Sequence, residues 1–253
     1  MPLGFREFEF DLPDALLNRL VETFDPMEQG PLTPEAVAEI PEEQGVYQLF
    51  HKGSLVYIGK TDAEAGLRQR LGRHSWTIQH RENLDPADAS FKAIRVFVFT
   101  AIDLETQLIK RYQKKAKVAW NFSGFGSNDP GRERDTTKSK PEGFDAQFPV
   151  DLDRAVETEI PSPASAFDVL AVLRKWLPYT LRFQPLKQGS RKGHTDLDAA
   201  IVTVPPGPIT TRQLLMQIIE SLPPGWQGTR VPGRVILYKE NREYAFGEVI
   251  AKS

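Results

Sequence analysis

The chain contains no cysteine, and only three methionines and four histidines in 253 residues. Without cysteine there can be no disulfide, no thiolate metal site and no cysteine nucleophile. No run of about 18 apolar residues occurs, so we expect no membrane-spanning helix. The first residues, MPLGFREFEFDLPD, are acidic and contain proline, with no basic segment followed by an apolar one. We therefore expect no secretory signal and a cytoplasmic protein.

Charge is distributed unevenly along a chain whose net charge is only −2. Residues 1–44 carry 2 Lys or Arg against 11 Asp or Glu, whereas residues 45–140 carry 17 against 10. Residues 141–253 are balanced, with 13 of each sign. A basic middle segment between acidic and neutral flanks is typical of a domain that binds a polyanion. Solvated charged surfaces without a partner produce the same distribution, so charge alone does not decide.

The pattern divides the chain into three parts. Residues 1–44 are expected to form an acidic leader with one or two short helices, the second starting at Thr33 with Pro34 in its first turn. Residues 45–140 are expected to form one domain with its loops. Residues 150–253 are expected to form a C-terminal α+β module.

Within the middle part, the spacing of apolar residues changes from a strand period to a helix period and back. The expected elements are strands over 46–50 and 55–58, a helix over 66–80, a strand over 91–99, and a helix over about 104–116. A Gly-containing turn between the first two strands predicts a β-hairpin. Asp103 is a favourable N-cap for the last helix. This order predicts an α+β fold, a small antiparallel sheet flanked by helices.

In the C-terminal part, proline clusters at 205–208 and 223–224 separate the expected elements. These elements are helices over 164–177 and 210–222 and strands over 200–204, 234–238 and 244–250. Nothing in this part indicates a chemistry.

A set of chemically versatile residues lies in the middle part. Its members are Gly45-Val46-Tyr47, Tyr57-Ile58-Gly59, Lys60, Arg70, His74, Glu105 and Asn121. The hairpin can bring Tyr47 and Tyr57 to one sheet edge, and Arg70 and His74 share a helix face because they are four residues apart. Each residue taken alone is also typical of a packing or surface position. Their joint order and spacing is what indicates a site.

This combination resembles the GIY-YIG nuclease superfamily over about 90 residues. The first triplet has Val46 where the family pattern has isoleucine. His74 and the stretch Trp120–Asp135 are similar to the type II restriction endonuclease branch of that superfamily. The resemblance implies a GIY-YIG nuclease domain that hydrolyses phosphodiester bonds in double-stranded DNA at a specific site, with Mg²⁺ as cofactor and Mn²⁺ able to substitute.

The resemblance also implies roles for the site residues. Glu105 holds the metal, which suits an ion that prefers oxygen ligands and keeps several waters. Arg70 clamps the scissile phosphate. Tyr47 or Tyr57 orients or deprotonates the attacking water, with His74 and Lys60 supporting or sharing that role. The ordinary pKa of histidine makes His74 a candidate base. Asn121 is expected to orient its neighbours.

Two groups of residues are candidates for DNA contact. A cluster on and after the last helix, Lys110, Lys114 and Lys115 among them, can follow the phosphate backbone or form a solvated surface. In the loop after it, Asn128, Arg132 and Arg134 are able to read base edges in the major groove.

Several alternatives remain open at this point. A palindromic site would be cut by a two-fold homodimer or by successive visits to the two strands. The C-terminal module could serve dimerisation or dock a protein partner, which would suit a defence-associated or structure-specific nuclease. A catalytically inactive DNA-binding or scaffold protein is a further alternative.

Overall fold

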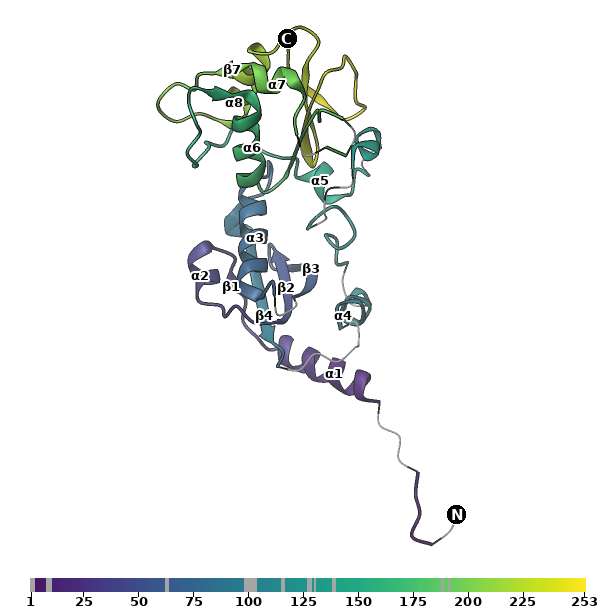
Figure 1. Ribbon diagram of the computed structural model, residues 1–253. Coiled ribbons are helices and arrows are strands. Elements are labelled where there is room, and N and C mark those ends of the chain that lie inside the picture. The colour runs from purple at the N-terminus through teal and green to yellow at the C-terminus, as the bar shows by residue number, and fades with distance from the viewer. Residues whose placement is uncertain are drawn as a thin grey trace. The chain divides into compact units, whose positions relative to one another are not determined.

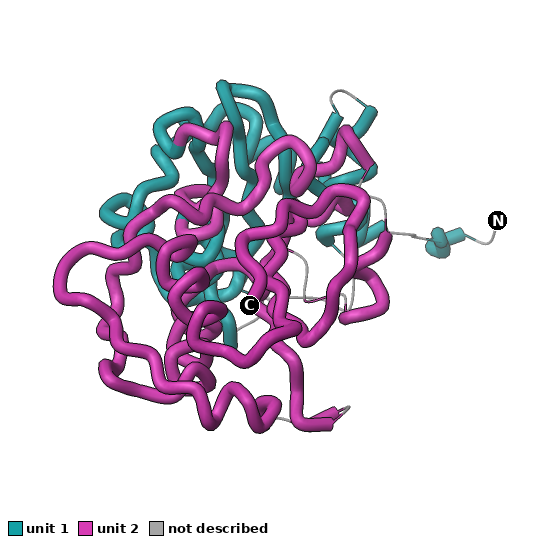
Figure 2. Tube along the Cα trace, turned by 90° about the horizontal axis from the view of Figure 1, so that it is seen from above, with its two compact units in different colours: residues 1–75, 86–121 teal, residues 76–85, 122–253 magenta. Residues whose placement is uncertain are grey.

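The computed structural model describes residues 3–7, 11–61, 64–97, 104–114, 117–126, 129, 131–137, 140–187, 189–190 and 192–253. The chain forms two compact units (Figures 1 and 2). The first unit comprises residues 1–75 and 86–121, and the second comprises residues 76–85 and 122–253. These boundaries differ from the expected ranges, because residues 1–44 join the first unit and residues 122–140 join the second.

The first unit is built on a four-stranded antiparallel sheet in the order β1-β4-β2-β3. Its strands are β1 (Gly30–Pro31), β2 (Gly45–His51), β3 (Ser54–Thr61) and β4 (Ala89–Arg95). The β2–β3 hairpin has the expected tight turn, with Lys52 and Gly53 both at positive φ (50° and 73°). Two consecutive residues with positive φ match the twist of the flanking strands.

Helices flank this sheet. They are α1 (Leu12–Phe24), α2 (Pro34–Ala38), α3 (Leu67–Gln79) and α4 (Leu104–Gln113), with a 3₁₀ turn at Pro86–Asp88. The α2 helix starts as expected, since the Thr33 side chain accepts a hydrogen bond from the Ala36 N–H. The last residues of α3 belong to the second unit. Asp103, the expected N-cap of α4, and the end of the expected strand at 98–99 lie outside the described residues.

The acidic leader contributes to the core of the first unit. The buried side chains of this core are Leu17, Leu20, Val21, Phe24, Val46, Ile58, Val96, Leu104, Leu108, Ile109, Tyr112 and Val118. They come from α1, α4, the segments flanking α4 and the sheet face that carries Val46 and Ile58. Residues alternate between faces along a strand, so Tyr47 and Tyr57 lie on the opposite face. The apolar stripe of α1 supplies Leu17, Leu20, Val21 and Phe24 to this core.

The second unit holds a four-stranded sheet in the order β10-β8-β9-β6, antiparallel except for the β6–β9 pair. Its strands are β6 (Thr180–Phe183), β8 (Gln227–Val231), β9 (Arg234–Tyr238) and β10 (Glu248–Lys252). A separate two-stranded ladder joins β5 (Ala164–Ser165) to β7 (Ile201–Val202).

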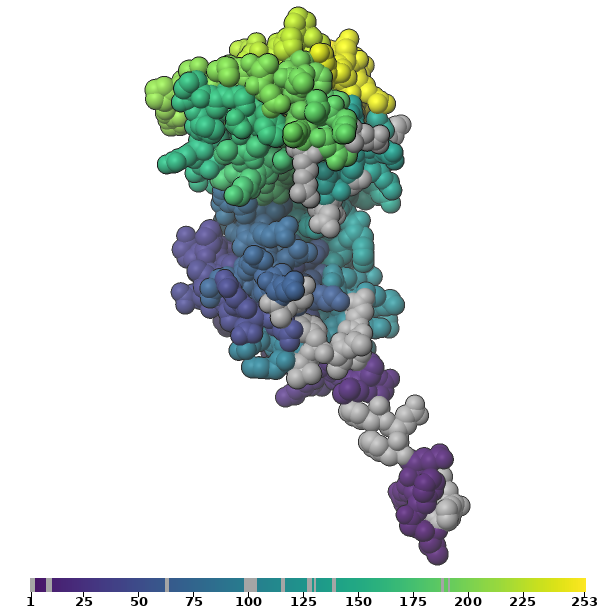
Figure 3. All heavy atoms as spheres, in the orientation of Figure 1, coloured from purple at the N-terminus to yellow at the C-terminus, as the bar shows by residue number. Residues whose placement is uncertain are grey.

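The helical elements of the second unit are η2 (Arg132–Thr136), α5 (Phe144–Gln147), α6 (Ala166–Trp176), α7 (Thr195–Ala199) and α8 (Thr211–Glu220). Helix α8 packs on β8 and β10, and α6 packs on β6. Figure 3 shows the same elements in space-filling form, with most of the second unit in the colours from teal to yellow. The chain is therefore an α+β protein with largely antiparallel sheets, as expected.

Three strands of the second unit were not expected, β5, β6 and β8, and β10 begins four residues later than the expected strand. The sequence of β8, Gln-Gly-Thr-Arg-Val, lacks apolar alternation. It is a strand because both its edges pair with neighbours. Gly228 allows close approach of α8, since a Cβ there would lie 2.5 Å from Ile219 Cδ1. Strand pairing and helix contact involve residues far apart in the sequence, so they produce no local sequence pattern from which β8 could be predicted.

No helix in the described part of the chain is long and apolar enough to cross a membrane.

Candidate active site

The β2–β3 hairpin places the two tyrosines on one face of the sheet. Tyr47 is in register with Gly59, and Tyr57 is in register with Leu49. Paired residues of antiparallel strands project to the same side, and the two tyrosine ring centroids lie 6.1 Å apart. A Cβ atom on Gly59 would overlap the hydroxyl and ring of Tyr47. The glycine of the second triplet therefore makes room for the tyrosine of the first.

Helix α3 adds His74 to this pair of rings. The Tyr47 hydroxyl lies 2.8 Å from His74 Nε2, and the imidazole centroid is 5.3 Å from that of Tyr57. His74 is 3% exposed. Burial, together with the charges of Arg70 and Arg73, lowers the pKa of His74 to about 3. His74 therefore stays a neutral imidazole well below pH 6.5, the ordinary pKa of a histidine, and the expectation that its ordinary pKa makes it a candidate base does not hold in this site.

One helical turn before His74, the Arg70 side chain interacts with the hydroxyls of both Tyr47 and Tyr57. Burial alone would lower the pKa of this guanidinium, but the interactions with the tyrosines raise it overall. Its Nε is buried and has no hydrogen-bond partner among the described residues. Arg70 is thus a permanent cation in contact with two phenols.

Both tyrosines are held as neutral phenols. Burial raises the pKa of Tyr47 well above its ordinary value, and the neighbouring Tyr57 adds to the shift. Burial and the negative charge of Glu105 raise the pKa of Tyr57. The electrostatic effect of Glu105 on Tyr57 means that the carboxylate lies near the two-tyrosine cluster.

Glu105 lies on α4, close enough to Tyr57 for its charge to act on that phenol. It lies in the first turn of α4, where a glutamate that only complements the helix dipole is normally solvent-exposed. Residues of a helix advance by about 100° each, so Glu105 falls between Tyr112 and Ile109 on the inward stripe. Its burial is intermediate. One half-buried carboxylate beside phenols and a guanidinium fits a largely hydrated Mg²⁺ or Mn²⁺, whose remaining ligands are water or phosphate.

Asn121 is bonded to the strand that carries Tyr57. Its Oδ1 accepts a hydrogen bond from the Ile58 N–H and its Nδ2 donates to the Ile58 carbonyl, both at 2.9 Å. The amide thus satisfies both backbone groups of one residue on the edge strand β3. Asn121 holds β3 in place and does not contact the aromatic cluster through these bonds.

Lys60 lies apart from the two tyrosines. It is exposed and in register with Val46, on the alternating positions that point away from Tyr57 and Gly59. The structure brings Tyr47, Tyr57, Arg70 and His74 together, with Glu105 nearby, and leaves Lys60 on the other side of the strand.

The candidate DNA-contact residues have different surroundings. Lys110 is exposed on α4, and Lys114 is exposed directly after it. Lys115 and Asn128 lie outside the described residues. Arg132 stacks over the Tyr238 ring at 4.1 Å and bonds to Gln184 at 3.2 Å, whereas Arg134 is exposed.

The turn that carries these arginines is fixed by a buried carboxylate that the sequence did not single out. Asp135 accepts hydrogen bonds from Arg182 (2.5 Å), Arg234 (2.7 Å) and Tyr238 (3.1 Å). Its side chain is 2% exposed. Arg132 and Asp135 are three residues apart in the 3₁₀ turn η2, so both face the sheet.

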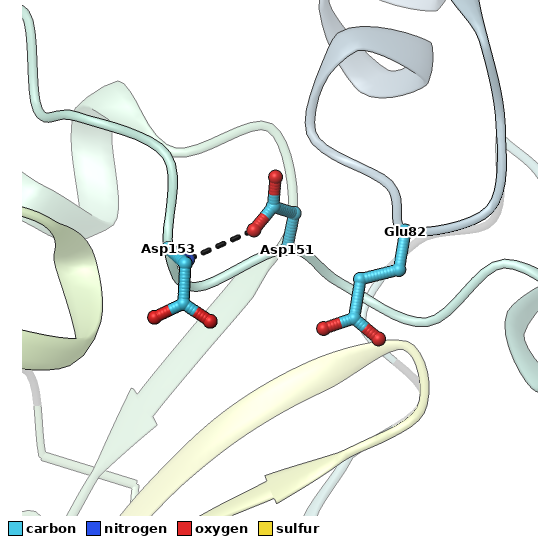
Figure 4. Close-up of side chains that lie close together, drawn as sticks. All are labelled: Glu82, Asp151 and Asp153. Carbon is cyan, nitrogen blue, oxygen red and sulfur yellow. Dashed lines mark hydrogen bonds between the residues drawn. The ribbon is translucent and has the colours of Figure 1, made fainter.

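A second group of acids lies in the second unit. Glu82, Asp151 and Asp153 lie close enough together to hold a cation (Figure 4). Two arginines already neutralise this group. Arg230 pairs with Glu82, and Arg212 bonds to Asp153 at 2.8 Å. These acids are therefore part of an ion-pair network, and Glu105 remains the candidate metal ligand.

No family model matches the chain, and the curated proteins contain no match to it. The resemblance to GIY-YIG nucleases rests on the residues named above and on their spacing.

Proposed function

We propose that the chain is a metal-dependent DNA endonuclease of the GIY-YIG type, and within that class a restriction enzyme that cuts double-stranded DNA at a specific site. This proposal rests on one observation. Four side chains lie in one cluster, those of Tyr47, Tyr57, Arg70 and His74, and Glu105 lies near it. These residues come from two strands and two helices. Their convergence supports a common role in a way that their separate positions in the sequence do not.

The reaction needs a water oxygen to bond to phosphorus while one P–O ester bond breaks. The water loses a proton and the leaving oxygen gains one. Arg70 presents a fixed cation that can bind the phosphate and stabilise the charge that grows on it. A bound Mg²⁺, held by Glu105, would supply further charge neutralisation at the phosphate.

Neither Tyr47 nor His74 is charged before the reaction, which restricts how a proton can leave the water. In the tautomer with hydrogen on Nδ1, His74 Nε2 accepts the Tyr47 hydroxyl proton across 2.8 Å. With its own proton directed to His74, the Tyr47 hydroxyl oxygen can accept a hydrogen bond from the attacking water and so orient it. The low pKa of His74 makes it too weak a base to take up the water proton itself. In this scheme His74 acts through Tyr47, and Tyr57 orients the water or phosphate together with Arg70.

The test is digestion of unmethylated phage DNA in millimolar Mg²⁺ by the wild type, Glu105→Gln, Arg70→Ala and Tyr47→Phe. Glu35→Gln is a matched control, because Glu35 is an exposed acid in the first turn of α2. We expect discrete fragments from the wild type and the control, and none from the three site variants. Cleavage that survives Glu105→Gln overturns the metal assignment.

If the wild type produces a smear of fragments that the site variants do not produce, the result would support nuclease activity at this site and contradict the proposal of a restriction enzyme. It would favour the defence-associated or structure-specific alternative, in which the second unit docks a partner. The described part of the second unit has its own core of 21 buried hydrophobic residues, as a separate module requires. Absence of cleavage with intact DNA binding would favour the inactive DNA-binding alternative.

A further inference from the structure

Glu105 and Tyr112 lie on the same stripe of α4. They are seven residues apart, and at about 100° per residue this places them within about 20° of each other around the helix. Tyr112 is 8% exposed and belongs to the core of the first unit. The rotation of α4 about its axis therefore sets the direction of both side chains together.

The Tyr112 hydroxyl is bonded to a residue of the acidic leader. It donates a hydrogen bond to Asp25 Oδ1 at 2.8 Å. Burial and this hydrogen bond raise the pKa of Tyr112 to about 12, so the phenol stays protonated as a donor. Asp25 directly follows the last residue of α1, and its bond to Tyr112 joins the end of α1 to α4.

The same residue is anchored to the sheet. Lys92 Nζ, on β4, donates to the Phe24 carbonyl at 2.8 Å and lies 3.4 Å from the Asp25 carbonyl. Lys92 is 9% exposed, so its ammonium is held inside the unit by these carbonyls. The chain of contacts runs from a paired inner strand through Asp25 to Tyr112, and along α4 to Glu105.

The rest of the α1–α4 contact cannot fix the helix rotation as closely. Apart from the exposed hydrogen bond between Arg111 and Asn18, it consists of apolar side chains, among them Leu17, Leu20 and Leu108. Apolar burial is itself non-directional, so these side chains resist rotation of the helix only through the shape of their packing. A hydrogen bond to a carboxylate is directional and stronger than one between neutral groups.

We propose that Asp25 and Tyr112 are positioning residues that set the rotation of α4 and so hold Glu105 in the direction needed to bind the metal. This inference rests on the proposed function, because it assumes that Glu105 is the metal ligand. Asp25 acts through Tyr112 in this scheme.

The experiment measures Mn²⁺ binding to the full chain directly, by water-proton relaxation, at a temperature where each variant is folded. Tyr112→Phe removes only the hydroxyl. We expect it to weaken Mn²⁺ binding about 10-fold, the lower end of what loss of an outer-shell partner costs a metal site. The Mg²⁺ concentration that half-saturates cleavage should rise by the same factor, with little change in rate at saturating metal.

Asn18→Ala is the matched control. It removes an exposed bond between the same two helices, from Arg111 Nη2 to Asn18 Oδ1 at 3.3 Å. We expect it to leave Mn²⁺ binding unchanged. A second pair of variants guards against a folding defect in Tyr112→Phe. Asp25→Asn keeps an oxygen acceptor and should retain most of the affinity, whereas Asp25→Ala should behave like Tyr112→Phe.

Wild-type Mn²⁺ affinity in Tyr112→Phe and Asp25→Ala, with Glu105→Gln unable to bind, would overturn the positioning role and leave the proposed function intact. Wild-type affinity in Glu105→Gln would overturn the metal assignment, and the positioning role with it. Equal weakening in Asn18→Ala would also count against the inference, because any contact between α1 and α4 would then suffice.

Discussion

The Tyr47 hydroxyl and His74 Nε2 lie 2.8 Å apart and join the central strand β2 to helix α3 through a buried hydrogen bond. The imidazole in this pair is neutral because burial lowers its pKa to about 3. The pair is therefore a neutral phenol and a neutral base in contact, with the cation of Arg70 beside the phenol.

Gly59→Ala is expected to abolish cleavage and to lower the free energy of unfolding by about 1–3 kcal/mol, the usual cost of overpacking. The added methyl would overlap the Tyr47 hydroxyl and displace the ring. Gly72→Ala on α3 is the control, because its Cβ would meet only Val37 Cγ1 at 3.9 Å. That change should keep activity and stabilise the helix slightly. Thermal unfolding and phage DNA digestion check both, and an active Gly59→Ala would contradict the packing argument.

Asn121→Asp is expected to destabilise the first unit by about 1–3 kcal/mol, since a donor to the Ile58 carbonyl is replaced by an oxygen. The edge strand β3, and Tyr57 with it, would lose a two-bond anchor. Equilibrium denaturation measures the loss. Asn83→Asp provides the same chemical change at an exposed loop position and should have little effect. Similar stability of the two variants would mean that the Asn121 amide does not hold β3.

The stability of the first unit should fall as the pH drops from 6.5 toward 3. His74 stays neutral in the folded chain down to about pH 3, whereas the unfolded chain takes up a proton near 6.5. Stability from this group is therefore complete above pH 6.5, and about 2 kcal/mol of it is lost by pH 5. Denaturation at pH 7 and pH 5 should show a larger loss for the wild type than for His74→Gln. His194→Gln, a change at a histidine of the second unit, is the control, and equal losses in all three proteins would refute the assignment.

Arg134→Ala is expected to weaken binding of duplex DNA about 10-fold or more, the worth of one good base contact. Arg134 is exposed, and the turn that carries it is fixed by Asp135. Arg132→Ala should mainly loosen the turn, because Arg132 stacks on Tyr238. Fluorescence anisotropy without divalent metal separates binding from cleavage. Lys175→Ala removes an exposed charge on α6 as a control, and an equal effect there would indicate only a general charge contribution.

The elements of the first unit were largely predictable, because they depend on neighbours in the sequence. The β2–β3 hairpin follows from two apolar runs around Lys52-Gly53, and the start of α2 follows from Thr33-Pro34. The strand β8 was not predictable, since Gly228 and its polar neighbours become a strand only between β9 and β10.

The sequence by itself determined the α+β class, the absence of thiol chemistry, and the spacing that makes Tyr47, Tyr57, Arg70, His74 and Glu105 candidates. These properties follow from composition and from local periodicity. Only the tertiary structure decided that the pKa of His74 is low, that the charge of Glu105 acts on Tyr57, and that Lys60 does not face the tyrosines. It also revealed the bonds of Tyr112 to Asp25 and of Arg234 to Asp135. Burial and contacts between residues 87 and 99 positions apart produce these features, and local sequence patterns carry no information about either.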